Sequence, residues 1–282
     1  MRMPNHALAS PAMDAATFTA FEHAGWERAA DAYAAVLARL TAQSVLPLLD
    51  ALGVGSGTRL LDLASGPGDL AAAALGRGAN TTAIDFSPAM IALGKTRHPG
   101  VDFRAGDVER LPLADGEADA AAIAYGLLHL ARPEAALAEG FRVLRPGGRF
   151  AATVWAPPER AHGFAIILDA VRTHGRSDVP LPPGPPFFRY SDPALFAAAL
   201  THAGFTEVRV ATIDQHWSLA DAGEFFTTMC AGTVRTGALL AAQDPAAFAR
   251  IRTAVESACE AYRQGGRVVL PMPAVMATGR RP

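Results

Sequence analysis

The sequence predicts an α/β fold in which a mainly parallel sheet carries helices on both faces. Three observations support this prediction. Strand-like and helical runs alternate between residues 59 and 155, a glycine-rich turn follows the first strand, and residues 118–124 are too apolar for a half-exposed strand. The chain has 282 residues, half of them hydrophobic and 18% charged, which is enough apolar material for a large core. This composition excludes a disordered protein.

Helices are expected before the first strand. Apolar residues from Phe18 to Leu40 recur at short, near-helical steps, which predicts a helix over residues 17–40. A second helix is expected over residues 42–52, ending at Gly53.

The alternating region follows. Its helices are expected after Gly68, after the cap formed by Ser87 and Pro88, and from Pro133, with a Pro-Gly-Gly turn at residues 146–148. Its strands are expected at residues 59–64, 81–85, 101–104, 118–124 and 149–155.

The alternation stops after Trp155. A proline-rich loop is expected at residues 179–188, and Gly265-Gly266 are expected to end the last helix. Helices are predicted at residues 165–174, 193–203, 219–230 and 245–264, and strands at residues 207–213 and 268–278.

Charge and cysteine content narrow the class of protein. The net charge of −2 gives no broad basic surface for nucleic acid or an anionic membrane. Cys230 and Cys259 form neither a disulfide framework nor a metal-ligand cluster. The most apolar stretch, residues 120–131, is shorter than the roughly 20 residues of a membrane-spanning helix. We therefore expect a cytoplasmic protein without a bound metal, and the near-absence of lysine suggests a bacterial source.

A glycine-rich turn between a strand and a helix is the strongest functional motif. It lies in LLDLASGPGD, residues 60–69, where Gly66 and Gly68 allow a ligand to approach the backbone at a helix N-terminus. Asp85 ends the next strand, 19 residues beyond Gly66, where a carboxylate can accept both hydroxyls of a ribose. The pattern predicts an adenosine-containing cofactor, although a tight turn beside a solvated acid would look the same.

Two cofactor classes compete for this motif. Gly66, Gly68 and Ala71 fit the dinucleotide fingerprint of NAD-binding proteins. Asp62 argues against NAD, because a carboxylate before the turn suits a cationic amino group better than a pyrophosphate. Asp107, in the motif Gly-Asp-Val after the third strand, can accept a hydrogen bond from an adenine amino group. The final elements also suit an antiparallel closing strand.

Four segments together resemble class I S-adenosylmethionine-dependent methyltransferases, within the UbiE-like and small-molecule branch. They are LLDLASGPGD, AIDFSPAM, AGDVERLPLADGEADA and FRVLRPGGRF, and the resemblance covers residues 59–155. It implies a Rossmann-like sheet with an antiparallel closing strand and helical cap segments, and S-adenosylmethionine as the cofactor.

The resemblance also implies roles for individual residues. Asp62 and the backbone of Ala64, Ser65 and Gly66 would hold the methionine end of the cofactor, with Gly68 completing the turn. Asp85 would bind the ribose, Phe86 and Met90 would lie beside the adenosine, Gly106, Asp107 and Val108 would hold the adenine, and Tyr125 would lie beneath the methyl donor. Ala64 stands where many members have glycine, and a residue this small is expected to be acceptable.

Residues for the acceptor are less specific. His129, just beyond the fourth strand, is the best candidate for a general base, and its alternative role is packing. Trp26, Tyr33, Tyr190 and Trp217 are candidates to contact an apolar substrate, although each could equally belong to the core.

These expectations define a domain layout. Residues 1–40 form an N-terminal helical cap and residues 41–155 the cofactor-binding core. Residues 156–282 complete that core, with cap insertions at residues 156–190 and 215–264. We expect methyl transfer to a small apolar or aromatic metabolite, at carbon, oxygen or nitrogen. The alternatives are a member that binds S-adenosylmethionine without methylating and, less favoured, an NAD-dependent oxidoreductase.

Overall fold

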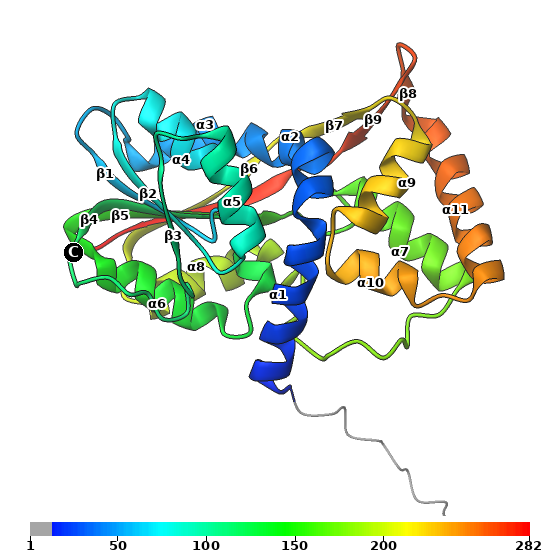
Figure 1. Cartoon of the computed structure of the whole chain (residues 1–282), viewed down its shortest axis with the longest axis horizontal. Helices are drawn as coiled ribbons and strands as arrows, with labels where there is room; N and C mark the ends of the chain where they lie inside the picture. The colour runs from blue at the N-terminus through cyan, green and yellow to red at the C-terminus, as the bar shows by residue number, and fades with distance from the viewer. Residues whose placement is uncertain (1–12) are drawn as a thin grey trace, which may run out of the picture.

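The computed structural model describes residues 13–282 (Figure 1). One half of the molecule contains the main sheet and its covering helices. The other half is mostly helical, and α1 (Ala15–Ala32) runs along the boundary between the two halves. This helix packs against elements of both halves, α5 (Pro88–Arg97) and α9 (Ala222–Ala231).

Seven strands form one sheet in the order β3-β2-β1-β4-β5-β10-β6. Their bounds are β1 (Arg59–Leu63), β2 (Asn80–Asp85), β3 (Asp102–Ala105), β4 (Ala118–Ala124), β5 (Leu144–Trp155), β6 (Thr206–Ile213) and β10 (Ala274–Arg280). The first five are parallel, whereas β10 runs antiparallel to both β5 and β6. The prediction that an antiparallel strand closes the sheet is confirmed by β10, although this strand is shorter than predicted.

Helices cover both faces of this sheet. Leu60 and Ala120 pack with α3 (Val45–Leu52) and α4 (Asp69–Gly76) on one face. Leu61 and Ala121 belong to the core on the opposite face, with α6 (Pro133–Val143) and α8 (Pro193–His202). Successive residues of β1 and β4 therefore enter different cores, which explains why residues 118–124 are apolar on both sides.

The N-terminal helices form one continuous run, and both predicted helices are present. After α1 the chain continues through a π-helical turn (Tyr33–Leu37), α2 (Ala38–Thr41) and a 3₁₀ turn (Ala42–Ser44) into α3. Gly53 ends the run in the left-handed conformation, with φ of +67°.

The same run also bears on the expectation that no segment spans a membrane. Judged by length and composition alone, this helical run could cross a membrane. In its most apolar 18-residue window, 39% of the residues are buried inside the structure. Buried core helices pass this test too, so it is weak evidence and the expectation stays a prediction.

The Pro-Gly-Gly segment at residues 146–148 differs from its predicted role. It lies inside β5 rather than before it. Ala118 pairs with Leu144 and Ala120 pairs with Arg149, so β5 accommodates the extra residues as a bulge in which Gly147 has φ of +79°.

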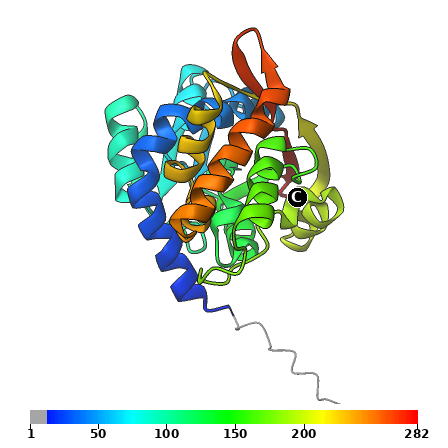
Figure 2. The same cartoon turned by 90° about the vertical axis from the view of Figure 1, so that its right-hand side faces the viewer.

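The helical half contains α7 (His162–His174), α9, α10 (Arg235–Ala241) and α11 (Pro245–Cys259). Figure 2 shows α9, α11 and α7 side by side. The sequence did not predict α10. It also placed the start of α9 too early, because β7 (His216–Leu219) occupies the preceding residues.

The expected closing strand over residues 268–278 is wrong as a single element. β9 (Arg267–Pro271) pairs with β7 and β8 (Arg263–Gln264) in a separate three-stranded sheet, and β10 alone joins the main sheet. Gly265 and Gly266 do not end a helix. Both have positive φ and form the two-residue turn between β8 and β9, where Gly-Gly is equally typical.

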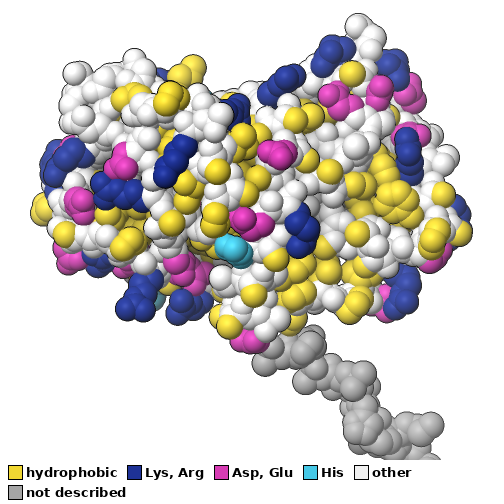
Figure 3. Space-filling view, viewed as in Figure 1, with side chains coloured by type: hydrophobic (Ala, Val, Ile, Leu, Met, Phe, Trp, Pro, Cys, Tyr) yellow, Lys and Arg dark blue, Asp and Glu magenta, His cyan; other side chains and the backbone are white. Residues whose placement is uncertain are grey.

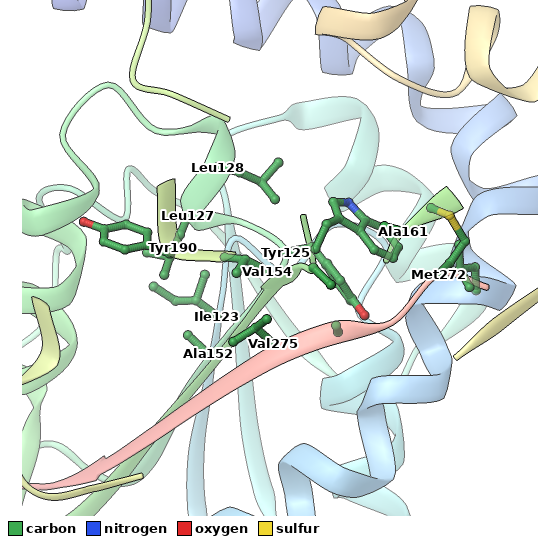
Figure 4. Packing of buried hydrophobic residues seen from close by; sticks show 14 of the residues in the cluster. Ile123, Tyr125, Leu127, Leu128, Ala152, Val154, Ala161, Tyr190, Met272 and Val275 are labelled. Carbon is green, nitrogen blue, oxygen red and sulfur yellow. The ribbon is translucent and has the colours of Figure 1, made fainter. Parts of the chain in front are cut away.

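One hydrophobic core joins the sheet to the helical half. It contains Val154 of β5, Phe225 of α9 and Ile251 of α11. Figure 4 shows its strand side, where Ile123, Val154 and Val275 lie close together. The helical half is therefore held against the sheet by continuous apolar packing rather than by a linker.

Candidate active site

A cavity opens where the carboxyl ends of the parallel strands meet the helical half. It encloses about 1350 Å³, including the space at its mouth. Residues after β1, β2, β3 and β4 form one side, and α1, α9, α10 and the proline-rich loop form the other. This edge of an open α/β sheet is where ligands usually bind.

The glycine turn borders the cavity through Ala64, Ser65, Gly66 and Pro67, whereas Gly68 is not among the lining residues. Gly66 and Gly68 both have positive φ, +53° and +82°, and α4 begins directly afterwards. A Cβ at Gly66 would meet no protein atom within 4 Å, so the backbone there borders open space. A Cβ at Gly68 would lie 2.4 Å from the Phe103 ring, so that glycine is required by packing.

Two buried carboxylates stand beside this turn. Asp62, 1% exposed, accepts a hydrogen bond from the Ala71 N–H at 3.0 Å. Asp85 accepts from the N–H groups of Gly66 (2.8 Å) and Ser87 (2.9 Å). Burial raises the pKa of both carboxyls, that of Asp62 well above its usual range. Within residues 13–282 no basic side chain pairs with either.

The sequence indicates only that Ala64 is small, at a position where many family members have glycine, and the structure adds a constraint on its backbone conformation. Its φ is +53°, a left-handed conformation that costs a non-glycine residue roughly 1–2 kcal/mol. Tyr125, at the end of β4, is also left-handed, with φ of +56°. The two strand ends also lie close together: a Cβ atom added at Gly126, the residue after Tyr125, would lie 2.7 Å from the Cβ atom of Ala64. Strained backbone gathered at two strand ends is typical of a functional site.

Hydrogen bonds hold Tyr125 in this conformation. Its hydroxyl lies 2.6 Å from Ser44 Oγ and 2.7 Å from the side-chain amide of Gln215. All three residues are buried, and the Tyr125 ring packs on Trp155 with centroids 4.3 Å apart. The segment that follows β4 is therefore rigid on the side facing the cavity.

The other predicted cofactor residues also line the cavity. Met90 and Val108 are buried, Phe86 is half-buried, and the Asp107 carboxylate is exposed. Ser65 and Gly106 line the cavity with them, and the Gly106 N–H donates to the Asp85 carbonyl oxygen at 2.9 Å.

The predicted acceptor residues divide into two groups. Trp26, Tyr33 and Trp217 line the cavity, with Trp26 and Tyr33 in edge-to-face contact at 5.5 Å. Tyr190 does not line it. That ring stacks on Phe196, and its hydroxyl donates to Glu134 at 3.0 Å. The prediction that Tyr190 contacts the acceptor is therefore wrong, because its ring packs in the core and its hydroxyl already has a hydrogen-bond partner.

His129 lies between the sheet edge and α1. Its Nδ1 is 2.9 Å from Oε2 of Glu22, and the ring contacts Trp26 (4.9 Å) and Phe187 (5.9 Å) edge-to-face. Glu22 is fully buried, and it was not identified as a site residue from the sequence. Its position in the apolar stripe between Phe18 and Trp26 was the available signal, because an acid on a buried helical face needs a partner.

Further residues belong to the site. Glu27 of α1 accepts hydrogen bonds from Ser87 Oγ and the Ala89 N–H, which ties α1 to the start of α5. Other residues that line the cavity, outside the cofactor motifs, are Phe164, Phe187, Met229, Thr233, Arg235 and Met272. Residues 13–282 contain no group of three His, Cys, Asp or Glu side chains suited to a metal ion.

Known proteins resemble this chain in sequence. A family described as "Methyltransferase domain" matches residues 61–152. A demethylmenaquinone methyltransferase from Beutenbergia cavernae is 46% identical over 123 residues, which are 42% of this chain and 51% of that protein. The ubiquinone/menaquinone biosynthesis C-methyltransferase UbiE of Methylobacterium nodulans is 35% identical over 187 residues, which cover 57% of this chain and 74% of that protein.

The fold is also found among solved structures. A chain from Bacillus halodurans aligns with a TM-score of 0.54 and 17% identity, covering 84% of this chain and 98% of that one. At this identity the likeness extends to the fold alone. In sequence, the chain spans about half the length of the demethylmenaquinone methyltransferases it matches.

We expect Asp62→Asn to stabilise the ligand-free protein at neutral pH by about 1–3 kcal/mol, because it removes a buried charge and keeps an acceptor for Ala71. The Asp62 pKa is higher in the folded than in the unfolded state. The unfavourable contribution of Asp62 to the free energy of unfolding is therefore absent below about pH 4, and it grows as the pH rises through the folded-state pKa of Asp62. Denaturant unfolding of both proteins from about pH 4 to about pH 8 measures the difference. Parallel stability curves would contradict it.

The two glycines of the turn should respond differently to alanine. Gly66→Ala should cost roughly 1–2 kcal/mol, from backbone strain alone. Gly68→Ala should cost about 1–3 kcal/mol more, because the Phe103 ring, wedged between Gly68 and Gly94, cannot move away. Urea unfolding of the two variants tests this order, and equal losses would show that the ring can rearrange.

Proposed function

Because this chain belongs to the UbiE-like family of class I S-adenosylmethionine-dependent methyltransferases, we propose that it methylates a small apolar or aromatic molecule. The observation that carries this proposal is the cavity itself. One wall is the strand-end motif for an adenosine cofactor, and the opposite wall is a set of aromatic side chains. The related demethylmenaquinone and ubiquinone/menaquinone enzymes suggest an acceptor of the quinone type.

The residues present fit S-adenosylmethionine. The backbone at Gly66 borders open space that a Cβ would enter. Asp62 is a buried carboxylate whose one hydrogen bond comes from a backbone N–H, and it can pair with the cofactor's ammonium group. The two Asp85 oxygens each accept one hydrogen bond and keep further lone pairs for the ribose hydroxyls. Asp107 is exposed and lines the cavity, which supports the proposal that it accepts a hydrogen bond from the adenine amino group.

Methyl transfer asks the protein mainly for alignment and exclusion of water. When bound, S-adenosylmethionine supplies an electrophilic methyl group on a cationic sulfur. Tyr33, Tyr125 and Trp26 line the cavity and can stabilise a cation beside their rings. The proposed cap, formed by residues 13–40, 156–190 and 215–264, would close over the acceptor; residues 1–12 of the predicted cap lie outside the described residues. The cavity-lining residues of this cap include Phe164, Trp217 and Met229.

His129 is the proposed general base. It lines the cavity, and its side chain is 17% exposed, so one ring edge is available to an acceptor. An acceptor hydroxyl can give its proton to the imidazole as the new bond to carbon forms. An acceptor carbon already activated by its own ring electrons would need less help.

We further propose a cytoplasmic, bacterial enzyme whose acceptor is a small molecule rather than a nucleic acid. On the face seen in Figure 3, acidic and basic side chains are interspersed, with no large patch of basic charge. A backbone-tracking nucleic-acid surface requires such a patch.

Two other functions are distinguished by simple measurements. A member that binds S-adenosylmethionine without methylating would bind it in calorimetry but release no S-adenosylhomocysteine with any acceptor. An NAD-dependent oxidoreductase is disfavoured by β10, which runs antiparallel to its neighbours, whereas the dinucleotide fold is built from two mononucleotide-binding βαβαβ halves. Quenching of NADH fluorescence on mixing would revive that function.

Asp85→Ala should weaken S-adenosylmethionine binding by about 1.5–3 kcal/mol, the usual scale for hydrogen bonds to a charged group. Asp107→Ala should weaken it by less, because adenine also gains apolar contact from residues such as Val108. Titration calorimetry measures both, with the unfolding midpoint as a check because Asp85 also ties two turns together. A larger loss at Asp107 would exchange the two roles.

If the acceptor is a hydroxyl, His129→Gln should lower turnover about 10²–10⁴-fold, the usual span for a general base. The loss should shrink at high pH, where the acceptor ionises without help. The affinity for S-adenosylmethionine should barely change, because His129 lies on the α1 side of the cavity. The measurement is a pH–rate profile of both proteins with a known acceptor. Parallel profiles of similar rate would leave His129 with a packing role.

A further inference from the structure

We infer that Glu22 is a positioning residue that sets which nitrogen of His129 carries the proton. The inference deepens the proposed function and rests on it. Glu22 lies on α1, its side chain is fully buried, and its Oε2 is 2.9 Å from His129 Nδ1. Its Oε1 is buried with no hydrogen-bond partner among the described residues. His129 is thus the only side chain of residues 13–282 that pairs with Glu22.

The chemistry of the pair fixes the direction of the hydrogen bond. An ionised carboxylate can only accept, so Nδ1 of the neutral imidazole must carry the hydrogen. The other ring nitrogen, Nε2, then keeps its lone pair. Because His129 lines the cavity while Nδ1 faces Glu22, Nε2 is the nitrogen left for the acceptor. Trp26 and Phe187 contact the ring edge-to-face and restrict its rotation.

The Glu22–His129 pair also stabilises the charge that His129 gains when it takes the proton of the acceptor hydroxyl. The O–H bond of the acceptor breaks, its electron pair stays on the acceptor oxygen, and its proton bonds to Nε2. The resulting imidazolium lies beside the Glu22 carboxylate, where low polarity strengthens the attraction. The proton leaves to solvent after the product departs. This is the work of the carboxylate in a nucleophile–histidine–carboxylate triad, here without a covalent intermediate.

The surroundings explain why the pair is not an incidental ion pair. A buried carboxylate with an unpartnered oxygen costs stability, and an apolar residue in the stripe of α1 would avoid that cost. Arg235 on α10 is a charged group near Glu22; it lines the cavity and donates to the Pro185 carbonyl oxygen at 3.1 Å rather than to Glu22. More distant charged groups on the cavity wall are Asp62, Asp69, Asp85 and Asp107.

The position of Glu22 depends on how α1 is anchored. Glu27, just over one turn further along, accepts hydrogen bonds from Ser87 Oγ and the Ala89 N–H at the start of α5. Both bonds end on Glu27 Oε1, an acceptor oxygen that glutamine keeps, so Glu27→Gln preserves this anchor and offers a matched control. Glu27→Gln makes the same chemical change on the same helix, without contact to His129.

The first experiment determines the His129 tautomer by NMR of ¹⁵N-histidine-labelled protein without cofactor. His129→Gln identifies the His129 signals. In wild type we expect the hydrogen on Nδ1. In Glu22→Gln the amide N–H can donate to Nδ1, so the Nε2–H form should gain population, as after carboxylate-to-amide substitution in a catalytic triad. Glu27→Gln should keep the wild-type tautomer.

The second experiment follows turnover with a hydroxyl acceptor. Glu22→Gln should lower kcat about 10²–10⁴-fold, with KM and S-adenosylmethionine affinity nearly unchanged and a smaller loss at high pH. A wild-type proton on Nε2, an unchanged tautomer in Glu22→Gln, or a kcat loss without a tautomer change would each overturn the inference. If no acceptor yields S-adenosylhomocysteine, the methyl-transfer proposal fails, whereas the tautomer result still stands or falls by itself.

Discussion

The side chain and backbone of Asp85 connect three turns at one edge of the sheet. Its two carboxylate oxygens accept from Gly66, after β1, and from Ser87, before α5. Its backbone oxygen accepts from Gly106, after β3. A charged acceptor shared by two backbone donors holds these loops more firmly than neutral hydrogen bonds would. Every residue proposed to contact the adenosine lies in or next to one of these turns, so the cofactor side of the cavity depends on this one buried group.

The second constraint is the placement of α1. Glu27 ties the helix to the turn that Asp85 organises, and Glu22 reaches His129 from the same helix. The cofactor side and the acceptor side of the cavity are therefore connected through a single rigid element. Trp26, between the two acids, contributes an aromatic wall. A displacement of α1 would open the proposed acceptor side and release the proposed base together, which suits chemistry that must exclude water.

Local patterns predicted most of the core and the cofactor side. The strand ends carrying Asp62, Asp85 and Asp107 were predictable because each acid follows or ends an apolar run beside a turn. The C-terminal third was harder. Gly265-Gly266 is as suitable for a hairpin turn as for a helix end, and the two-residue β8 leaves no periodicity to detect. The aromatic residues Tyr190 and Trp217 look alike in sequence, yet only Trp217 lines the cavity.

Between residues 59 and 155 the sequence by itself determined the order of strands and helices, the glycine turn and the acids near the strand ends, because these depend on neighbours within a few residues. The tertiary structure decided which distant side chains meet. Glu22 and His129 are 107 positions apart, and Ser44, Tyr125 and Gln215 form one network across three segments that are distant in the sequence. The tertiary structure also places Ala64 in a strained left-handed backbone conformation, which cannot be predicted from the residue type. Such contacts depend on how helices dock on the sheet, and docking is set by the packing of the whole core.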